Sequence, residues 1–210
     1  ELAGANGKMI IRLDPKFSAV ENAQKYFAEY KRLKVAAARV PALLARANAD
    51  LEYAEQMLND LELAENRAEI DAVMHAARAA GLVNQTRRVP KIPARVSAPR
   101  EIKSRDGFTI LIGKNARQNE DITFNHARPN DLWLHARGVA GAHVVIRGAG
   151  KEIPLSTIKE AAQLAAQNSQ ARNESRVDVI VTEKKNVRRV RGGKPGMVTV
   201  REERVVRVES

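Results

Sequence analysis

The first third of the chain carries one apolar stripe of helical spacing. From Ala19 to about Ala64 there is no glycine, and the apolar residues recur at steps of three, four and seven. This spacing predicts an amphipathic helix of coiled-coil type, roughly 70 Å long. Ser18 and Glu21 form a capping box at its start, and Pro41 predicts a kink or a tolerated bend. The stripe consists of Val20, Phe27, Tyr30, Leu33, Ala37, Val40, Leu44, Leu51, Leu58 and Leu61.

A one-sided stripe of this length requires a partner. The pattern predicts no second helix of comparable length, so we expect the partner to come from another chain or from upstream sequence. The chain opens on a β-like run with Glu1 in place of an initiator methionine, which indicates the C-terminal part of a longer protein. The alternative is a bundle in which the long helix folds back on shorter helices of the same chain.

A short strand, a short helix and a linker complete the first half. Lys8 to Leu13 alternate as a strand. Asn66 is placed to cap a helix that ends at Gly81. Residues 85–99 carry three prolines and several arginines without a helical period, which predicts a linker. The expected domains are residues 1–86 (strand, long helix and short helix), 87–99 (linker) and 100–210 (a compact domain).

The second half alternates between short β-branched runs and helical segments. The runs predict strands, and a capping box at Thr157–Glu160 predicts a helix whose small residues allow close packing on a sheet. The expected strands span residues 100–104, 108–112, 142–146 and 177–182, with a closing hairpin of 197–200 and 205–208, and a further helix spans 116 to about 125. The predicted fold class is α+β: a long coiled-coil-type helix followed by a compact mixed α/β domain.

The segment Asp131–Ala136 alternates so strictly that it predicts two distinct strand faces. Leu132, Leu134 and Ala136 share one face. Asp131, Trp133 and His135 share the other, and an aromatic ring flanked by an acid and an imidazole is suited to stacking and hydrogen bonding to bases. The alternative is that Trp133 is a core residue and His135 a hydrogen-bonded structural histidine.

Several motifs stand in a fixed order along the chain. They are IRLDP at 11–15, ENAQKYF at 21–27, IGKNARQN at 112–119, NDLWLHAR at 130–137, GAHVVI at 141–146 and KPG at 194–196. Together they resemble the RqcH/NEMF family: the first half resembles its middle region, and the second half its NFACT-R domain. Members are ribosome quality control factors, many of them labelled fibronectin-binding proteins.

The resemblance implies both an architecture and a function. The long helix would be the returning helix of an antiparallel coiled-coil arm, and its partner would be the upstream outgoing helix of the full-length protein. The full protein would bind large ribosomal subunits obstructed by peptidyl-tRNA, contact rRNA and tRNA, and support template-free alanine tailing of the stalled chain. The family's tRNA-selecting residues lie in its N-terminal domain, so the part of the protein that this chain covers is expected only to dock on the subunit and tRNA. The alternative is a fibronectin-binding surface adhesin.

The positive charge is concentrated in the second half. Residues 1–86 carry 11 Lys/Arg against 12 Asp/Glu, whereas residues 87–210 carry 25 against 13. Such an excess attracts polyanions such as nucleic acid. Residues 184–194 hold six basic residues and no acid, which predicts a flexible loop along a phosphate backbone, with a merely solvated loop as the alternative. Gly113–Asn115 precede a helix whose amides favour anions, although a plain turn fits equally well.

These arguments give one set of candidate RNA-binding residues. The set is Lys114, Asn115, Asn119, Asn130, Asp131, Trp133, His135, Arg137, His143, Lys184, Lys185, Arg188, Arg189, Arg191 and Lys194.

Other chemistry has little support in the sequence. The absence of cysteine excludes disulfides and thiolate metal sites and fits a reducing compartment. His126, His135 and His143 are spaced by nine and eight residues, which matches no familiar metal motif. No nucleophile elbow surrounds Ser156 or Thr109. We therefore expect no enzyme activity, catalytic residue, metal or cofactor, no membrane partner, and a cytoplasmic location.

Overall fold

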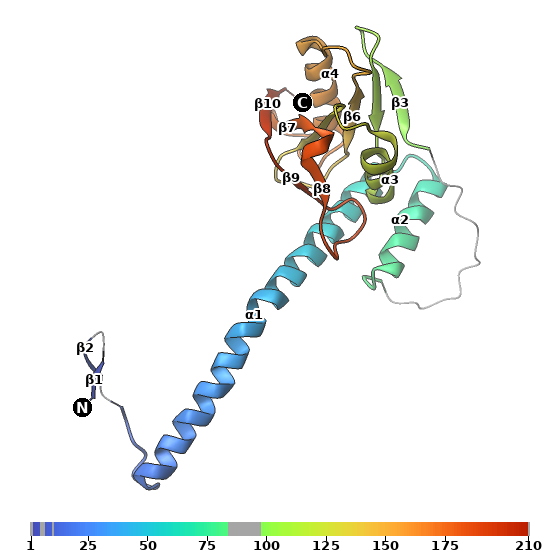
Figure 1. Ribbon diagram of the computed structural model, residues 1–210. Helices are drawn as coiled ribbons and strands as arrows, with labels where there is room; N and C mark the ends of the chain where they lie inside the picture. The colour runs from blue at the N-terminus through green and yellow to red at the C-terminus, as the bar shows by residue number, and fades with distance from the viewer. Residues whose placement is uncertain (1, 5–6, 10, 84–97, 210) are drawn as a thin grey trace. The chain divides into compact units, whose positions relative to one another are not determined.

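The computed structural model describes residues 2–4, 7–9, 11–83 and 98–209 (Figure 1). Their contacts divide the chain into two compact units, residues 1–48 and 49–210. This division falls inside the long helix, upstream of the predicted linker, most of which lies outside the described residues. The expected three-part domain division stays a prediction.

The first unit contains two short strands and most of the long helix. β1 (Leu2–Gly4) pairs antiparallel with β2 (Gly7–Met9). β2 is shorter than the predicted strand Lys8–Leu13. The helix α1 (Ala19–Glu62) contains Pro41, as predicted. Its capping box is confirmed: the Ser18 backbone N–H donates to Glu21 Oε2 at 2.7 Å, and the Glu21 N–H donates to Ser18 Oγ at 3.3 Å.

The apolar stripe of α1 is exposed throughout the first unit. Several stripe residues each expose more than half of their surface area, namely Val20, Phe27, Tyr30, Leu33, Val40 and Leu44. The described residues therefore leave this face uncovered, and the expected partner helix stays a prediction.

The second unit is built on a six-stranded antiparallel sheet in the order β10-β7-β5-β6-β4-β3. The strands are β3 (Arg100–Lys103), β4 (Thr109–Ile112), β5 (Leu132–Ala136), β6 (Val144–Arg147), β7 (Val177–Glu183) and β10 (Arg204–Val208). With the four helices of the described residues, the sheet confirms the α+β class.

The predicted closing hairpin is wrong. β9 (Val198–Val200) pairs with β8 (Val187–Arg189) as a separate two-stranded sheet, and β10 pairs with β7. Thr182 Oγ1 of β7 donates to the carbonyls of Arg201 and Glu202 at 3.1 and 3.2 Å. These bonds hold the turn after β9 against β7, so the chain continues along the edge of the main sheet.

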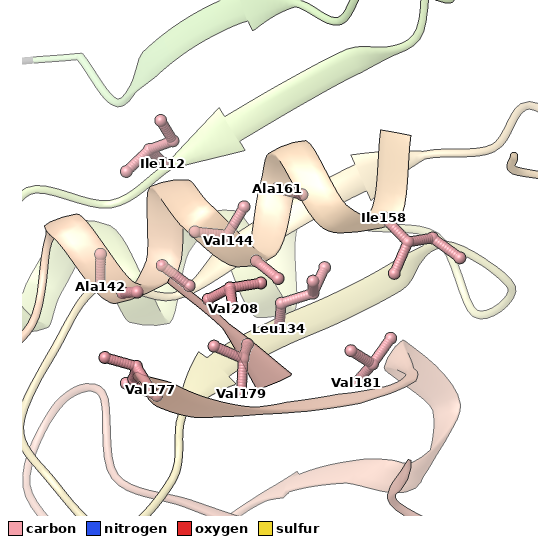
Figure 2. Packing of buried hydrophobic residues seen from close by; sticks show 14 of the residues in the cluster. Ile112, Leu134, Ala142, Val144, Ile158, Ala161, Val177, Val179, Val181 and Val208 are labelled. Atoms are coloured by element: carbon pink, nitrogen blue, oxygen red, sulfur yellow. The ribbon is translucent and has the colours of Figure 1, made fainter. Parts of the chain in front are cut away.

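One face of the sheet packs against the helix α4 (Leu155–Gln167). Figure 2 shows Ile158 and Ala161 of α4 lying over Leu134, Val144 and Val179 of the strands. The four alanines of α4 are completely buried, as expected for close approach to a sheet. The predicted capping box is wrong, however, because the helix begins at Leu155 and Thr157 lies inside it. Thr157 Oγ1 donates instead to Asp106 Oδ2 at 2.7 Å.

The opposite face is covered by two other segments. One consists of α3 (Ala116–Asp121) followed by the π-helical turn η1 (Ile122–His126), close to the predicted helix. The other is the β8–β9 hairpin, preceded by the short 3₁₀ turn η2 (Lys184–Asn186). Residues of both segments form a second core with the sheet.

The last turns of α1 and the helix α2 (Arg67–Ala79) belong to the second unit. Asn66 caps α2 as predicted, since its side chain accepts the Glu69 N–H at 3.1 Å. Tyr53 and Met57 of α1 pack with Val73 of α2 and with Ala116. The compact part of the chain therefore includes more than the predicted domain of residues 100–210.

Candidate nucleic-acid interface

Trp133 lies inside the second core. Only 1% of its surface is exposed, and it packs with Ile122 of η1 and Val187 of β8. The alternation that put Trp133 opposite Leu132 and Leu134 is confirmed, but the interpretation of that face as a stacking surface is wrong. The π-helical turn and the β8–β9 hairpin cover the face, so Trp133 is the core residue of the alternative interpretation.

A buried polar network surrounds this tryptophan. Trp133 Nε1 donates to Thr123 Oγ1 at 3.2 Å, and Thr123 Oγ1 lies 2.8 Å from His143 Nδ1. Asn119 Oδ1 accepts the His143 N–H at 2.9 Å, while Asn119 Nδ2 donates to the Gly141 carbonyl at 3.0 Å. The network satisfies buried polar groups that otherwise cost free energy. Asn119 and His143 therefore hold α3 against the segment that leads into β6.

Both histidines of this region are neutral. His135 stacks on Trp133 with ring centroids 5.7 Å apart and is edge-on to His143 at 5.4 Å. Burial lowers the pKa of His135 to about 4 and lowers the pKa of His143 well below its ordinary value. Neither ring supplies positive charge to a ligand near neutral pH.

The side chains of Lys114 and Asn115 are both engaged within the fold. Asn115 caps α3 by accepting the Gln118 N–H at 3.0 Å. Lys114 Nζ donates to Glu69 at 2.9 Å and to Glu65 at 3.3 Å. The hydrogen bond to Glu69 is the main cause of a raised Lys114 pKa. The charge of Lys114 is thus shared with two carboxylates, which weakens the prediction of an anion site there.

The remaining residues of the NDLWLHAR motif differ in exposure. Asp131 is buried, and its carboxylate accepts the backbone N–H groups of Arg128 at 2.8 Å and Gly148 at 3.0 Å. It therefore fixes two loops. Asn130 and Arg137 are exposed, and Arg137 lies 3.7 Å from Glu203. Only these two offer their side chains at the surface.

The basic segment 184–194 is structured, so the prediction of a flexible loop is wrong. Arg189 pairs with Glu120 at 2.9 Å and lies 4.0 Å from the centre of the Phe124 ring. Lys194 pairs with Asp50 at 3.4 Å, and Lys185 pairs with Glu183 at 2.5 Å. Lys184 is half-buried, 5.6 Å from the Phe124 ring centre.

Arg188 and Arg191 differ from the other cations of this segment. Both are exposed, and no ion pair of theirs is recorded among the residues that the structure describes. They are therefore the two cations of the segment best placed to meet a phosphate backbone.

A second group of cations, missed by the sequence interpretation, lines a cleft of about 490 Å³ at one end of the sheet. Its basic residues are Lys103, Arg128, Arg147 and Lys151. They are scattered along 49 residues, so no local window shows their charge. The antiparallel strand order brings the end of β3, the start of β4 and the end of β6 to the same end of the sheet, so the order of the strands reveals this group of cations.

Among residues 2–4, 7–9, 11–83 and 98–209, no group of three or more His, Cys, Asp or Glu is arranged to hold a metal ion. In the same part of the chain, no helix combines the length and the apolar character needed to cross a bilayer.

Comparison with known proteins identifies relatives over almost the whole chain. Residues 99–202 match the NFACT protein RNA binding domain, and residues 3–93 match the NFACT N-terminal and middle domains. The chain is 36% identical over 200 residues to the Rqc2 homolog RqcH of Streptococcus suis, covering 94% of this chain and 35% of that protein. It is 36% identical over 195 residues to RqcH of Bacillus subtilis, covering 90% and 33%. The chain thus spans about a third of the length of these curated relatives.

A solved structure has the same fold. It is the C-terminal part of the fibronectin/fibrinogen-binding protein from Streptococcus suis, with a TM-score of 0.78 and 32% sequence identity. The match covers 93% of this chain and 77% of that one.

Proposed function

We propose, from the premise that this chain belongs to the RqcH/NEMF family of NFACT proteins, that it is the RNA-docking part of a ribosome quality control factor. One observation carries the proposal. The match to the NFACT RNA binding domain, at residues 99–202, falls within the half that carries 25 Lys/Arg against 13 Asp/Glu. A domain with this excess binds phosphate backbones by releasing their condensed counterions.

The covered sheet limits how RNA is bound. Because helices and a hairpin pack on both faces, bases do not stack on the strands, and contact depends on exposed cations at the rim. Arg137, Arg188 and Arg191 are exposed candidates from the sequence. Such contacts position a protein on RNA by its shape and phosphates. We therefore propose that the domain holds rRNA and tRNA with little base specificity.

The exposed stripe of α1 supports a proposal about the coiled-coil arm of the full protein. In the full protein it would be covered by an outgoing helix, forming an arm that places the basic domain on an obstructed large subunit. The whole factor would then support template-free alanine tailing of the stalled chain in the cytoplasm. This part would contribute docking and no catalytic group.

A second candidate function follows from the solved relative, which is named a fibronectin/fibrinogen-binding protein. A surface adhesin of this kind would bind an extracellular protein and would not require a preference for RNA. One experiment separates the two functions. The purified chain is sedimented with large ribosomal subunits, and in parallel it is applied to immobilised fibronectin.

The proposal expects co-sedimentation that weakens steeply between low and high salt, because phosphate contacts are lost as counterions compete. Ribonuclease treatment of the subunits should abolish it. Retention on fibronectin together with no sedimentation would reject the docking function and support the adhesin.

A further inference from the structure

Three of the residues that line the cleft at the end of the sheet form one row of cross-strand neighbours. Lys103 of β3 lies opposite Thr109 of β4, and Thr109 lies opposite Arg147 of β6. Directly opposed residues in antiparallel strands point to the same face. The two cations therefore flank the threonine hydroxyl, and Lys103 Nζ donates to Thr109 Oγ1 at 2.6 Å. Rigid strands, not a loop, position these three groups.

The carboxylates of the cleft are already engaged. Asp131 accepts the N–H groups of Arg128 and Gly148, and Asp106 Oδ2 accepts Ser156 Oγ at 2.6 Å and Thr157 Oγ1 at 2.7 Å. In the part of the chain described by the structure, no ion pair is recorded for Arg128, Arg147 or Lys151. Four cations against two engaged carboxylates leave the cleft positively charged.

The walls leave room for a ligand. A tight turn closes one side, in which the Lys151 N–H donates to the Gly148 carbonyl at 2.9 Å. Ala149 and Gly150 occupy its tip with φ of 50° and 80°, so small residues face the surface there. Phe108, partly buried against the first core, supplies an apolar wall. A volume of about 490 Å³ lies within the range of small-molecule sites and is far too small for a duplex.

We propose that this cleft binds one unpaired nucleotide of an RNA strand. The assignment rests on the proposed function and adds to it a defined single-stranded subsite. Arg147 and Arg128 contact phosphate, Thr109 and Lys103 offer polar groups to the ribose and phosphate, and Phe108 contacts the base or sugar. This combination of cations and one apolar wall suits a single-stranded nucleotide.

The test compares two matched pairs of substitutions in the full chain. Arg128→Gln with Arg147→Gln removes two charges from the cleft. Arg100→Gln with Arg176→Gln removes two exposed charges beyond the opposite end of the sheet, where β3 and β7 begin. Binding of a fluorescein-labelled ten-nucleotide uridine RNA is followed by anisotropy at several salt concentrations, and circular dichroism melting verifies the fold.

The cleft pair should weaken binding about tenfold or more and lower the salt slope by about 1.4, at about 0.7 per single-strand phosphate contact. The control pair should weaken it less than about threefold. Arg128→Lys with Arg147→Lys should restore most of the salt slope. Uridine monophosphate should shift the amide resonances of Thr109 and Gly148 in the wild type and not in the cleft pair.

The outcomes separate the two proposals. If the wild-type chain binds large subunits and the decamer, but both pairs of variants lose affinity equally, the cleft is only part of a diffuse basic surface and the inference falls. If only free uridine monophosphate binds there, the site serves a soluble nucleotide and the RNA subsite is rejected. A wild-type chain that binds neither RNA nor subunits overturns the docking function together with the subsite.

Discussion

Replacing Asp60 with asparagine should change the pH dependence of stability of residues 49–210. Asp60 is buried near the end of α1, where its carboxylate accepts the Ala116 N–H at 3.0 Å and Gln56 Nε2 at 2.7 Å. Burial raises its pKa from 3.8 to about 7, against the opposing effect of these two hydrogen bonds. The bond to Ala116 joins α1 to the first residue of α3, so Asp60 reports on the docking of the long helix.

The sign follows from the direction of the pKa shift. Since the folded-state pKa is the higher one, the folded protein holds a proton between about pH 4 and about pH 7 that the unfolded chain has released. The contribution of Asp60 to the free energy of unfolding is therefore greatest at low pH and falls as the pH rises through this window. At about 1.4 kcal/mol per pH unit, the fall amounts to about 4 kcal/mol.

Asparagine keeps the shape of the side chain and an acceptor for Ala116, but it does not ionise. Its amide nitrogen would face Gln56 Nε2, and Gln56 Oε1 already accepts the Gly141 N–H at 3.0 Å. One hydrogen bond, worth about 1 kcal/mol, is lost. Asp60→Asn should thus be about 1 kcal/mol less stable than wild type near pH 3, about equally stable near pH 4.5, and about 3 kcal/mol more stable near pH 8.

Urea unfolding followed by the fluorescence of Trp133, the only tryptophan, measures this difference. Burial lowers the pKa of His135 to about 4, which gives a slope of opposite sign, but that slope cancels between variant and wild type. Asp71→Asn removes a carboxylate that pairs with Arg67 at the surface and serves as the control. Parallel pH curves for Asp60→Asn and wild type would refute the reasoning.

Three further predictions concern the core, the basic hairpin and the long helix. Trp133→Ala should destabilise the second unit by about 3 to 5 kcal/mol, measured by urea unfolding followed by far-ultraviolet circular dichroism, whereas unchanged stability with weaker RNA binding would restore the stacking interpretation. Arg188→Gln with Arg191→Gln should flatten the salt dependence of large-subunit sedimentation by one to two units without changing the melting temperature; an unaltered slope would make these residues a solvated surface. Amide exchange should be fast at residues 20–44 and slow at 53–60, and equal protection would contradict the packing difference.

Local patterns predicted the parts of the fold that depend on neighbours in sequence. The capping box of Ser18 and Glu21 and the cap of Asn66 require only residues three positions apart, and both formed as expected. The Thr157 box failed because a distant carboxylate, Asp106, takes its hydroxyl and the helix already begins at Leu155. A capping motif thus predicts its helix start only where no tertiary acceptor competes for the side chain.

Alternation along β5 predicted which residues share a face but not what covers that face. The cover of Trp133 comes from residues 116–126 and 187–200, which lie before and well after β5 in the chain. The alternation within a single strand carries no information about which distant segments cover its faces. The same limit explains the wrong closing hairpin, since the strands around residue 202 have similar patterns. The pairing of β10 with β7 is accompanied by contacts between residues distant in sequence, among them those of Thr182 with the turn after β9.

A high density of basic residues along the sequence did not predict which cations are left without a carboxylate partner among the described residues. Of the six cations in residues 184–194, Arg189, Lys194 and Lys185 have carboxylate partners, one of them contributed by Asp50 of α1. A contiguous basic run attracts acids from the rest of the fold, because pairing relieves the mutual repulsion of its members. Single cations at strand ends avoid such ion pairs when backbone amides or hydroxyls already donate to the nearby carboxylates. Asp131 and Asp106 of the cleft are engaged in this way. The cleft and the pair Arg188 and Arg191 are accordingly where RNA contact is best sought, and both were recognisable only after strand order and hydrogen bonding were known.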